Sequence, residues 1–318
     1  MSATVDTAHA GLRLSDVHVR IPLPGRPRRW VHAATEVDLE VRPGRVTAVV
    51  GESGCGKSVL ALAMLGLLPA GTRTSGRIDH RGVDLLGARE AELRALRGRR
   101  IGLVPQSAVT HLNPVRTVGA TVAESLRVHG LPADTDVVDG LLADVGLPAG
   151  TAGRYPHELS GGMAQRVLVA MTVALRPDVL VADEPTSALD PDSGRLVLRA
   201  LADQARAGAA VLLITHDLVA AREVADAVAV MYAGRLLEVG PADRVLRAPV
   251  HDYTQALLAA LPENGLRPAP GVPSSLVDPP PGQCAWHRRV GVACVPGHRD
   301  EESSVACVPI GDADAVLA

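Results

Sequence analysis

The sequence predicts an α/β protein whose core is a mainly parallel β-sheet. Apolar runs with the length of buried strands recur at residues 46–50, 179–182 and 209–214. A glycine-rich loop separates the first run from residues 59–68, whose length suits a helix. The composition, with 47% hydrophobic and 21% charged residues, is that of a globular chain.

Length and charge exclude several classes of protein. With 318 residues and a net charge of −3, the chain can bury a real core, and intrinsic disorder is excluded for most of its length. The balance of 32 basic against 35 acidic residues provides no overall positive field, so we expect no nucleic-acid partner. The apolar stretch at 59–70 is shorter than the roughly 20 residues of a spanning helix, and the N-terminus shows no export signal, so a cytoplasmic protein is expected.

The loop after the first strand has the pattern of a phosphate-binding loop. In such loops backbone N–H groups converge on phosphate oxygens, the lysine reaches the β- and γ-phosphates, and the next hydroxyl binds Mg²⁺. Lys57 in this loop is the only lysine of the chain. We expect a nucleotide to bind through Gly51, Glu52, Ser53, Gly54, Cys55, Gly56, Lys57, Ser58 and Val59.

Two carboxylates follow the apolar run at 179–182. Asp183 at the strand end is placed to hold Mg²⁺, directly or through water, and Glu184 to orient and deprotonate an attacking water molecule. A strand that ends in solvated charge is the alternative explanation. The phosphate-binding loop earlier in the chain favours the first interpretation.

Four further motifs occur along the chain. The segment 159–162 reads LSGG and precedes apolar residues at helical spacing, Gln106 follows an apolar run, 187–190 reads SALD, and His216 follows the strand at 209–214. Together with the loop and the acidic pair, this order resembles the nucleotide-binding subunits of ABC transporters. The resemblance covers residues 11–262 and implies an ATPase that acts as a pair, with ATP held between the loop of one subunit and the LSGG segment of the other.

The resemblance also implies roles for individual residues. Trp30 would stack on adenine, although it is alternatively a surface anchor, and His216, alternatively a histidine whose hydrogen bonds are satisfied at a strand end, would contact the γ-phosphate. The implied catalytic residues are Glu184, His216, Gln106 and Lys57. The implied Mg²⁺ ligands are Ser58, Gln106 and Asp183, and the residues facing the partner's nucleotide are Ser160, Gly161, Gly162 and Asp190.

The expected domain organisation follows the same resemblance. A flexible N-terminus (1–10) precedes the ATP-binding domain (11–262), which combines the P-loop core with an antiparallel β subdomain that includes 12–19 and 37–41 and an inserted helical subdomain at about 107–175. Seven prolines between 262 and 281 predict an extended linker at 263–283. A cysteine-containing tail (284–318) follows.

Several stretches, including YPHELSGGM at 155–163 and HDYTQALL at 251–258, resemble the ATPases of dipeptide, oligopeptide and nickel importers. This resemblance implies uptake of peptides or nickel. The implied partners are a second, different ATPase subunit, two transmembrane permease subunits and an extracytoplasmic substrate-binding protein. This chain itself would lie at the cytoplasmic face of the membrane. Two alternatives remain at this point. One is a soluble ABC-type ATPase of DNA repair or translation, and the other is metal or redox sensing through the tail.

The tail contains three cysteines, Cys284, Cys294 and Cys307. In some members of the resembling branch, four tail cysteines hold an iron–sulfur cluster, but here Val290 stands where the second would be. Three thiolates with His287 or His298 could still bind zinc or a cluster. Because one thiolate is missing, we expect free thiols instead.

Overall fold

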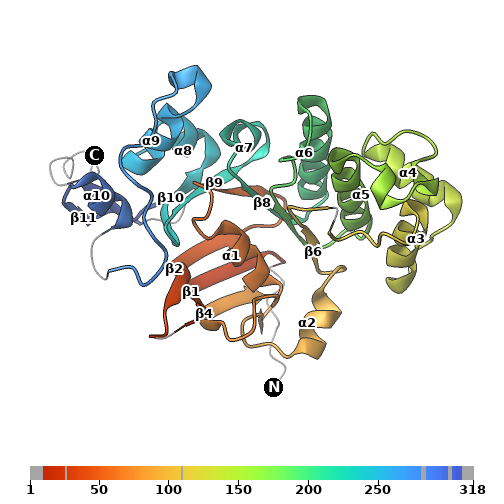
Figure 1. The fold of residues 1–318 in the computed structure, drawn as a ribbon, viewed down its shortest axis with the longest axis horizontal. Helices are drawn as coiled ribbons and strands as arrows, with labels where there is room; N and C mark the ends of the chain where they lie inside the picture. The colour runs from red at the N-terminus through yellow and green to blue at the C-terminus, as the bar shows by residue number, and fades with distance from the viewer. Residues whose placement is uncertain (1–9, 26, 109, 281–283, 300–302, 310–318) are drawn as a thin grey trace.

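A seven-stranded sheet forms the centre of the protein (Figure 1), in a computed structural model that describes residues 10–25, 27–108, 110–280, 284–299 and 303–309. Residues 1–9 of the expected flexible N-terminus and residues 310–318 of the tail lie outside the described residues. The strand order is β12-β10-β9-β3-β8-β7-β6. Its members are β3 (Val46–Val50), β6 (Ile101–Val104), β7 (Val179–Asp183), β8 (Ala210–Thr215), β9 (Ala227–Tyr232), β10 (Arg235–Pro241) and β12 (Ser304–Val305).

The five strands from β9 to β6 run parallel, whereas β10 and β12 are antiparallel to their neighbours. Every residue of β3, β7 and β8 is buried, because both faces of the sheet are covered. Successive side chains enter opposite layers: Ala48 and Val50 belong to one apolar core, and Val49 belongs to the other. The mainly parallel core predicted from the apolar runs is confirmed.

Helices pack on both faces of this sheet. The first core contains residues of helices that follow β7 to β10 along the chain, and the second contains α1 together with a second sheet. Figure 1 shows α1 between the two sheets. The helices of this part are α1 (Lys57–Met64), α2 (Glu90–Leu96), α6 (Pro191–Arg206), α7 (Leu218–Val224), α8 (Ala242–Arg247) and α9 (Asp252–Ala259).

The second sheet is the expected antiparallel layer. Its order is β2-β1-β4-β5, and Leu12 pairs with Val41 at the start of the register. On β1 the buried side chains alternate except at a register shift between Leu14 and Val17. They are those of Leu12, Leu14, Val17 and Val19. The strands are β1 (Leu12–Pro22), β2 (Trp30–Val41), β4 (Arg73–His80) and β5 (Val83–Asp84).

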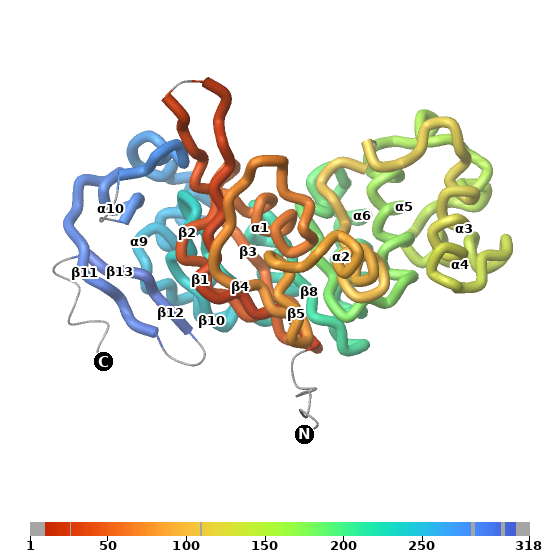
Figure 2. The backbone as a smooth tube through the Cα atoms, turned by 90° about the horizontal axis from the view of Figure 1, so that it is seen from below, coloured from red at the N-terminus to blue at the C-terminus, as the bar shows by residue number. Residues whose placement is uncertain are grey.

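A group of helices projects from the sheet edge at β6 and lies at one end of the molecule in both views (Figures 1 and 2). It falls within the segment expected to be a helical subdomain. Thr117, Asp134 and Ser160 cap its three α-helices by accepting backbone N–H bonds in the first turn. The elements are α3 (Val118–Val128), α4 (Thr135–Asp144), α5 (Gly161–Ala174) and the 3₁₀ turns at Thr151–Gly153 and Pro156–Glu158.

The C-terminal segment lies at the opposite end of the molecule (Figure 2). After a 3₁₀ turn (Pro262–Asn264), the proline-rich stretch runs past β2, where the His32 amide donates to Leu276 O at 2.8 Å. The tail then forms α10 (Ala285–Val290) and the paired strands β11 (Cys294–Pro296) and β13 (Cys307–Pro309). Between them, β12 joins the central sheet beside β10. No helix in the described ranges has the length and apolar character needed to cross a membrane.

Candidate nucleotide site

Four neighbouring strands deliver the candidate residues to one edge of the central sheet. In the order β3-β8-β7-β6, Val50 is level with Thr215, and Asp183 is level with Ile214. The glycine-rich loop, His216 and Gln106 follow the ends of β3, β8 and β6. Asp183 is the last residue of β7, and Glu184 comes directly after it. Because the strands are parallel, their carboxyl ends converge, and this edge is where ligands of open α/β sheets bind.

The glycine-rich loop needs glycine for close packing. A Cβ at Gly51 would lie 2.1 Å from Met231 O, and one at Gly56 would lie 2.0 Å from Ala33 O. Gly56 also has a φ of 114° as the cap residue of α1. Lys57 is buried and donates to the carbonyl oxygens of Gly51 at 2.8 Å and Glu52 at 3.0 Å. The ammonium group is thus held against the loop at the N-terminus of α1.

Ser58 and Asp183 bring two oxygen ligands together. Ser58 Oγ donates to Asp183 Oδ1 at 3.1 Å. Burial raises the pKa of Asp183 and the nearby Glu184 carboxylate adds to the effect, while the Ser58 hydrogen bond opposes it. A divalent cation would favour the charged carboxylate, and hard oxygen ligands suit Mg²⁺. The residues present therefore fit the ion that the sequence analysis expects here.

Glu184 is buried and strained. Its φ of 49° is unusual for a residue with a side chain, and strain of this kind gathers at functional sites. His216 Nδ1 lies 2.8 Å from Glu184 Oε1, although the imidazole itself is largely exposed. The structure therefore joins the two residues, which are 32 positions apart in the sequence, into one hydrogen-bonded pair.

The signature helix is tied to the segment that contains Gln106. Gln165 of α5 is buried, and its Nε2 donates to Pro105 O at 3.0 Å. Gln106 itself is exposed just beyond the end of β6. This hydrogen bond links α5 directly to the residue before Gln106.

Ser160, Gly161 and Gly162 lie at the N-terminus of α5, where Ser160 Oγ accepts from the Met163 amide at 3.2 Å. Ser160 and Gly161 are exposed. Figures 1 and 2 place α5 with α3 and α4, away from α1. The chain's own loop and its own signature segment therefore stand apart, and both helix N-termini are suited to anions.

Asp190 caps α6 by accepting from the Ser193 amide at 3.0 Å. The segment before it packs on the start of α5, because a Cβ at Gly162 would lie 3.0 Å from Leu189 Cδ2. The side chain of Asp190 is thus occupied within its own helix. Contact with a partner's nucleotide remains a prediction for this residue.

Trp30 begins β2, and the guanidinium groups of Arg28 and Arg73 each lie 4.7 Å from its ring centroid. Its backbone amide donates to Asp278 Oδ1 at 3.0 Å. These cation–π contacts compete with the adenine ring that the sequence analysis assigns to this side chain. Stacking on adenine stays a prediction.

Two residues that contact the glycine-rich loop were missed by the sequence analysis. Tyr253 OH accepts from the Glu52 amide at 3.2 Å. Arg289, which is almost fully buried, donates to both Glu52 carboxylate oxygens, at 3.1 and 3.2 Å. Both residues lie more than 200 positions from Glu52, and no local pattern points to this contact. The C-terminal segment thus reaches the nucleotide site.

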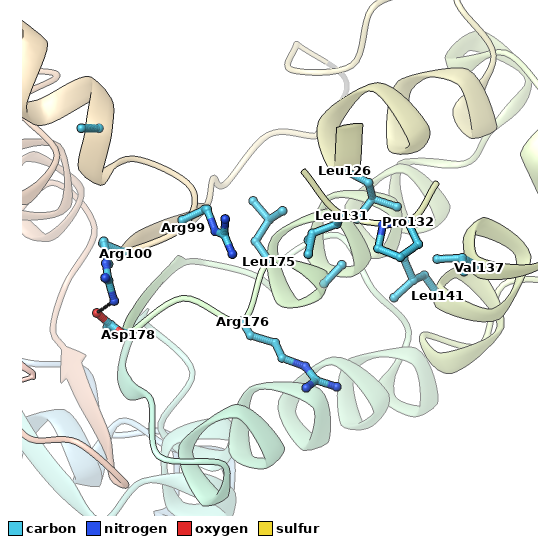
Figure 3. A pocket seen from close by; sticks show the side chains of 12 residues that line it. Arg99, Arg100, Leu126, Leu131, Pro132, Val137, Leu141, Leu175, Arg176 and Asp178 are labelled. Atoms are coloured by element: carbon cyan, nitrogen blue, oxygen red, sulfur yellow. Dashed lines mark hydrogen bonds and ion pairs between the residues drawn. The ribbon is translucent and has the colours of Figure 1, made fainter. Parts of the chain in front are cut away.

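A cavity of about 710 Å³ lies elsewhere, between the helical subdomain and the start of β6 (Figure 3). Its lining includes Arg99, Arg100 and Asp178 near the amino ends of β6 and β7, and Leu131 and Leu141 of the helical part. Phosphates bind at the carboxyl ends of such strands. This cavity is therefore not the nucleotide site.

The tail cysteines are all free thiols in the described residues. The structure brings Cys284 and Cys307 together with two buried imidazoles, those of His251 and His287, and the four ligand atoms lie within 4.8 Å of one another. Cys294 is outside this group. His298, the other fourth ligand considered from the sequence, is outside it as well.

Comparison with known proteins agrees with this geometry. Residues 34–187 match the family described as "ABC transporter", and residues 237–293 match "Oligopeptide/dipeptide transporter, C-terminal region". The dipeptide transport ATP-binding protein DppD of Bacillus subtilis is 39% identical over 284 residues, which cover 85% of this chain and 84% of that protein. DppD of Escherichia coli is 42% identical over 263 residues, with 79% and 80% covered.

Among solved structures, the ATP-binding cassette MJ0796, described as a dimer in a post-hydrolysis state bound to ADP and Pi, superimposes with a TM-score of 0.65. It is 25% identical, and the match covers 73% of this chain and 98% of that one. Fold and site thus define an ATP-binding cassette ATPase. The chain belongs to the ATP-binding subunits of ABC transporters, and the fold class and ATPase activity predicted from the motifs are confirmed.

Proposed function

We propose that this chain hydrolyses ATP to energise the import of peptides. The match of residues 237–293 to the C-terminal region of oligopeptide and dipeptide transporters carries the proposal. Relatives whose names specify dipeptide transport support it. Nickel is the second cargo that the sequence resemblance left open. Cargo is chosen by other subunits, so the experiment below includes both.

In the proposed mechanism Lys57 binds the β- and γ-phosphates, and the N–H groups of its loop bind the remaining phosphate oxygens. Ser58, Asp183 and Gln106 would hold Mg²⁺, whose charge offsets that of the phosphates. The 3.1 Å hydrogen bond between Ser58 and Asp183 supports this assignment, because it places two hard ligands side by side.

Glu184 acts as the general base toward water, and His216 contacts the γ-phosphate. Their 2.8 Å separation supports a joint role, because the imidazole orients the carboxylate that receives the proton. Burial of Glu184 keeps its carboxylate away from competing solvent. The remaining catalytic contribution is positioning and charge stabilisation of the transferring phosphoryl group.

The other half of each site comes from a second chain. Ser160, Gly161 and Gly162 would bind the partner's nucleotide, together with Asp190. Their exposed position at a helix N-terminus apart from the chain's own loop supports this proposal. Met163 after the signature is typical of one of two unlike ATPase subunits, so we propose a different chain as the partner. Two transmembrane permease subunits and an extracytoplasmic binding protein complete the transporter. This chain lies at the cytoplasmic face of the membrane.

The test is to co-express the chain with the ATPase, permease and binding-protein genes that neighbour it, and to measure ATP turnover of the complex in lipid. We expect dipeptides or oligopeptides to stimulate turnover in the presence of the binding protein. Stimulation by nickel salts and not by peptides would overturn the cargo. Failure of the chain to co-purify with permeases would overturn the transporter assignment.

A further inference from the structure

A closed cluster of metal-binding side chains lies in the C-terminal part of the molecule, outside the nucleotide site. His251 caps α9, Cys284 and His287 come from the start of α10, and Cys307 begins β13. Both imidazoles are fully buried, and the four potential ligand atoms lie within 4.8 Å of one another. Three segments far apart in sequence thus converge on one point.

Two of the distances between these atoms match those around a tetrahedral ion. Cys307 Sγ lies 3.6 Å from His251 Nε2 and 3.3 Å from His287 Nδ1. Zinc bonds of about 2.3 Å to sulfur and about 2.0 Å to nitrogen separate the ligand atoms by about 3.3 to 3.8 Å. The two distances from Cys307 already have these values, and the other pairs need to close by at most about 1.5 Å, from no more than 4.8 Å.

A carboxylate lies behind both imidazoles. Asp252 Oδ1 is 3.1 Å from His251 Nδ1 and 3.0 Å from His287 Nε2, and Trp286 Nε1 donates to Oδ2 at 2.8 Å. Metal-bound histidines usually donate their second ring N–H to such a carboxylate. Asp252 Oδ1 is close to His287 Nε2 but not in the direction of a hydrogen bond. Among the described residues, this buried nitrogen therefore has no hydrogen-bond partner. A small rotation of the imidazole on metal binding would correct that.

Two groups compete for Nδ1 of His251. The Tyr253 amide donates to His251 Nδ1 at 3.0 Å and to Asp252 Oδ1 at 3.1 Å. When a metal binds, the Tyr253 amide would donate to Asp252 alone and the Nδ1–H group would donate to the same carboxylate, so that the lone pair of Nε2 faces the ion. That is the form in which an imidazole binds a metal.

The ligand set does not fit an iron–sulfur cluster of the four-cysteine type. It offers two thiolates and two imidazoles, and Val290 occupies the position of the missing cysteine. Two sulfurs and two nitrogens in tetrahedral arrangement suit zinc, and four protein ligands with no open position make a structural site.

We propose that His251, Cys284, His287 and Cys307 bind one structural zinc ion. The ion joins α9 of the ATPase body to α10 and β13 of the tail. Through α10 it also holds Arg289, whose guanidinium contacts Glu52 of the glycine-rich loop at 3.1 Å. The tail is thereby fastened to the nucleotide site, in place of the free thiols expected from the sequence.

The experiment measures zinc, iron and acid-labile sulfide in the full chain after anaerobic purification. We expect about one zinc per chain and neither iron nor sulfide above background. Cys284→Ser and His251→Ala should each lose most of the zinc. Cys294→Ser is the comparison variant, because the Cys294 thiol lies beside that of Cys307 but outside the four ligands, and it should retain the ion.

Measurements on the unaltered chain keep the test independent of how the variants fold. X-ray absorption at the zinc edge should show two sulfur and two nitrogen neighbours. Chelation should release the zinc and expose Cys284 and Cys307 to alkylation. Absence of metal, iron with sulfide, three sulfur neighbours, or zinc loss in Cys294→Ser would each overturn the proposal.

Discussion

The nucleotide site and the four-residue tail cluster are connected through the contact of Arg289 with Glu52, but they are built in opposite ways. The nucleotide site is spread along one edge of a parallel sheet, where its residues lie at or just beyond the ends of four strands. The tail cluster gathers four ligand atoms within 4.8 Å of one another, and three of the four residues are buried. The signature segment is exposed at Ser160, whereas the tail cluster buries both imidazoles completely.

The two proposals differ in whether one chain completes the site. In the proposed mechanism the exposed N-terminus of α5 binds the nucleotide of a partner chain. A tetrahedral set with a carboxylate behind it needs only the ion. Hydrolysis should therefore depend on assembly with another chain, whereas zinc binding should not.

The largest effect is expected for Glu184→Gln. The amide cannot accept the proton of the attacking water, so ATP turnover should fall by about 10²- to 10⁴-fold while ATP binding persists. Turnover and nucleotide binding are measured on the same preparation. Glu124→Gln, at an exposed ion pair in the helical subdomain, is the control and should keep its turnover. Near-normal turnover of Glu184→Gln would refute its role as the base.

Ser160→Arg tests whether the site is divided between chains. The bulky cation would fill the helix N-terminus, so turnover of the assembled transporter should fall by about 10²- to 10³-fold. The affinity of the chain's own loop for ATP should stay nearly unchanged. Thr117→Arg alters another helix cap of the same subdomain and should cost about 1 kcal/mol of stability without this loss. Full hydrolysis by the isolated Ser160→Arg monomer would exclude a shared site.

Asp252→Asn tests the support behind the tail cluster. Loss of the carboxylate should lower zinc affinity by about 10- to 100-fold, as for other groups that orient metal-bound histidines. Competition with a chromophoric chelator measures the affinity. Asp243→Asn, at an exposed ion pair on α8, is the control. Equal affinities in both variants would show that Asp252 does not orient the imidazoles.

Glu238→Gln should have the smallest effect. This buried carboxylate accepts from the amides of Val250 at 2.8 Å and His251 at 3.1 Å, just before α9. A glutamine can accept only with its oxygen, and its NH₂ group would face an amide donor. We expect a loss of about 1 to 3 kcal/mol in the free energy of unfolding, measured by urea titration. No change would mean that water replaces the lost bond.

Much of the nucleotide site could be predicted because its motifs are local. Lys57 and Ser58 sit in one continuous loop, and a parallel sheet brings the loop and Asp183 to the same edge. The bond between Gln165 and Pro105 could not be foreseen, since neither residue belongs to a motif that specifies the contact.

The tail cluster was only partly predictable. Its cysteines and His287 drew notice through the family pattern, but His251 lies in a stretch interpreted only as a sign of the importer branch. The cluster depends on long-range strand pairing: β11 pairs with β13, and β12 pairs with β10. No periodicity in the sequence encodes those contacts, so the grouping of Cys307 with His251 emerges only in three dimensions.

The pairing of β12 with β10 also bears on how a newly made chain folds. Ser304 and Val305 are synthesised after every other strand of the central sheet, so β10 presents an unpaired edge until they arrive. Open edges invite association between chains, and folding begins while synthesis continues. Cys307 emerges two residues later, and zinc bound there would hold β12 in place and end the period in which nascent chains can aggregate through β10.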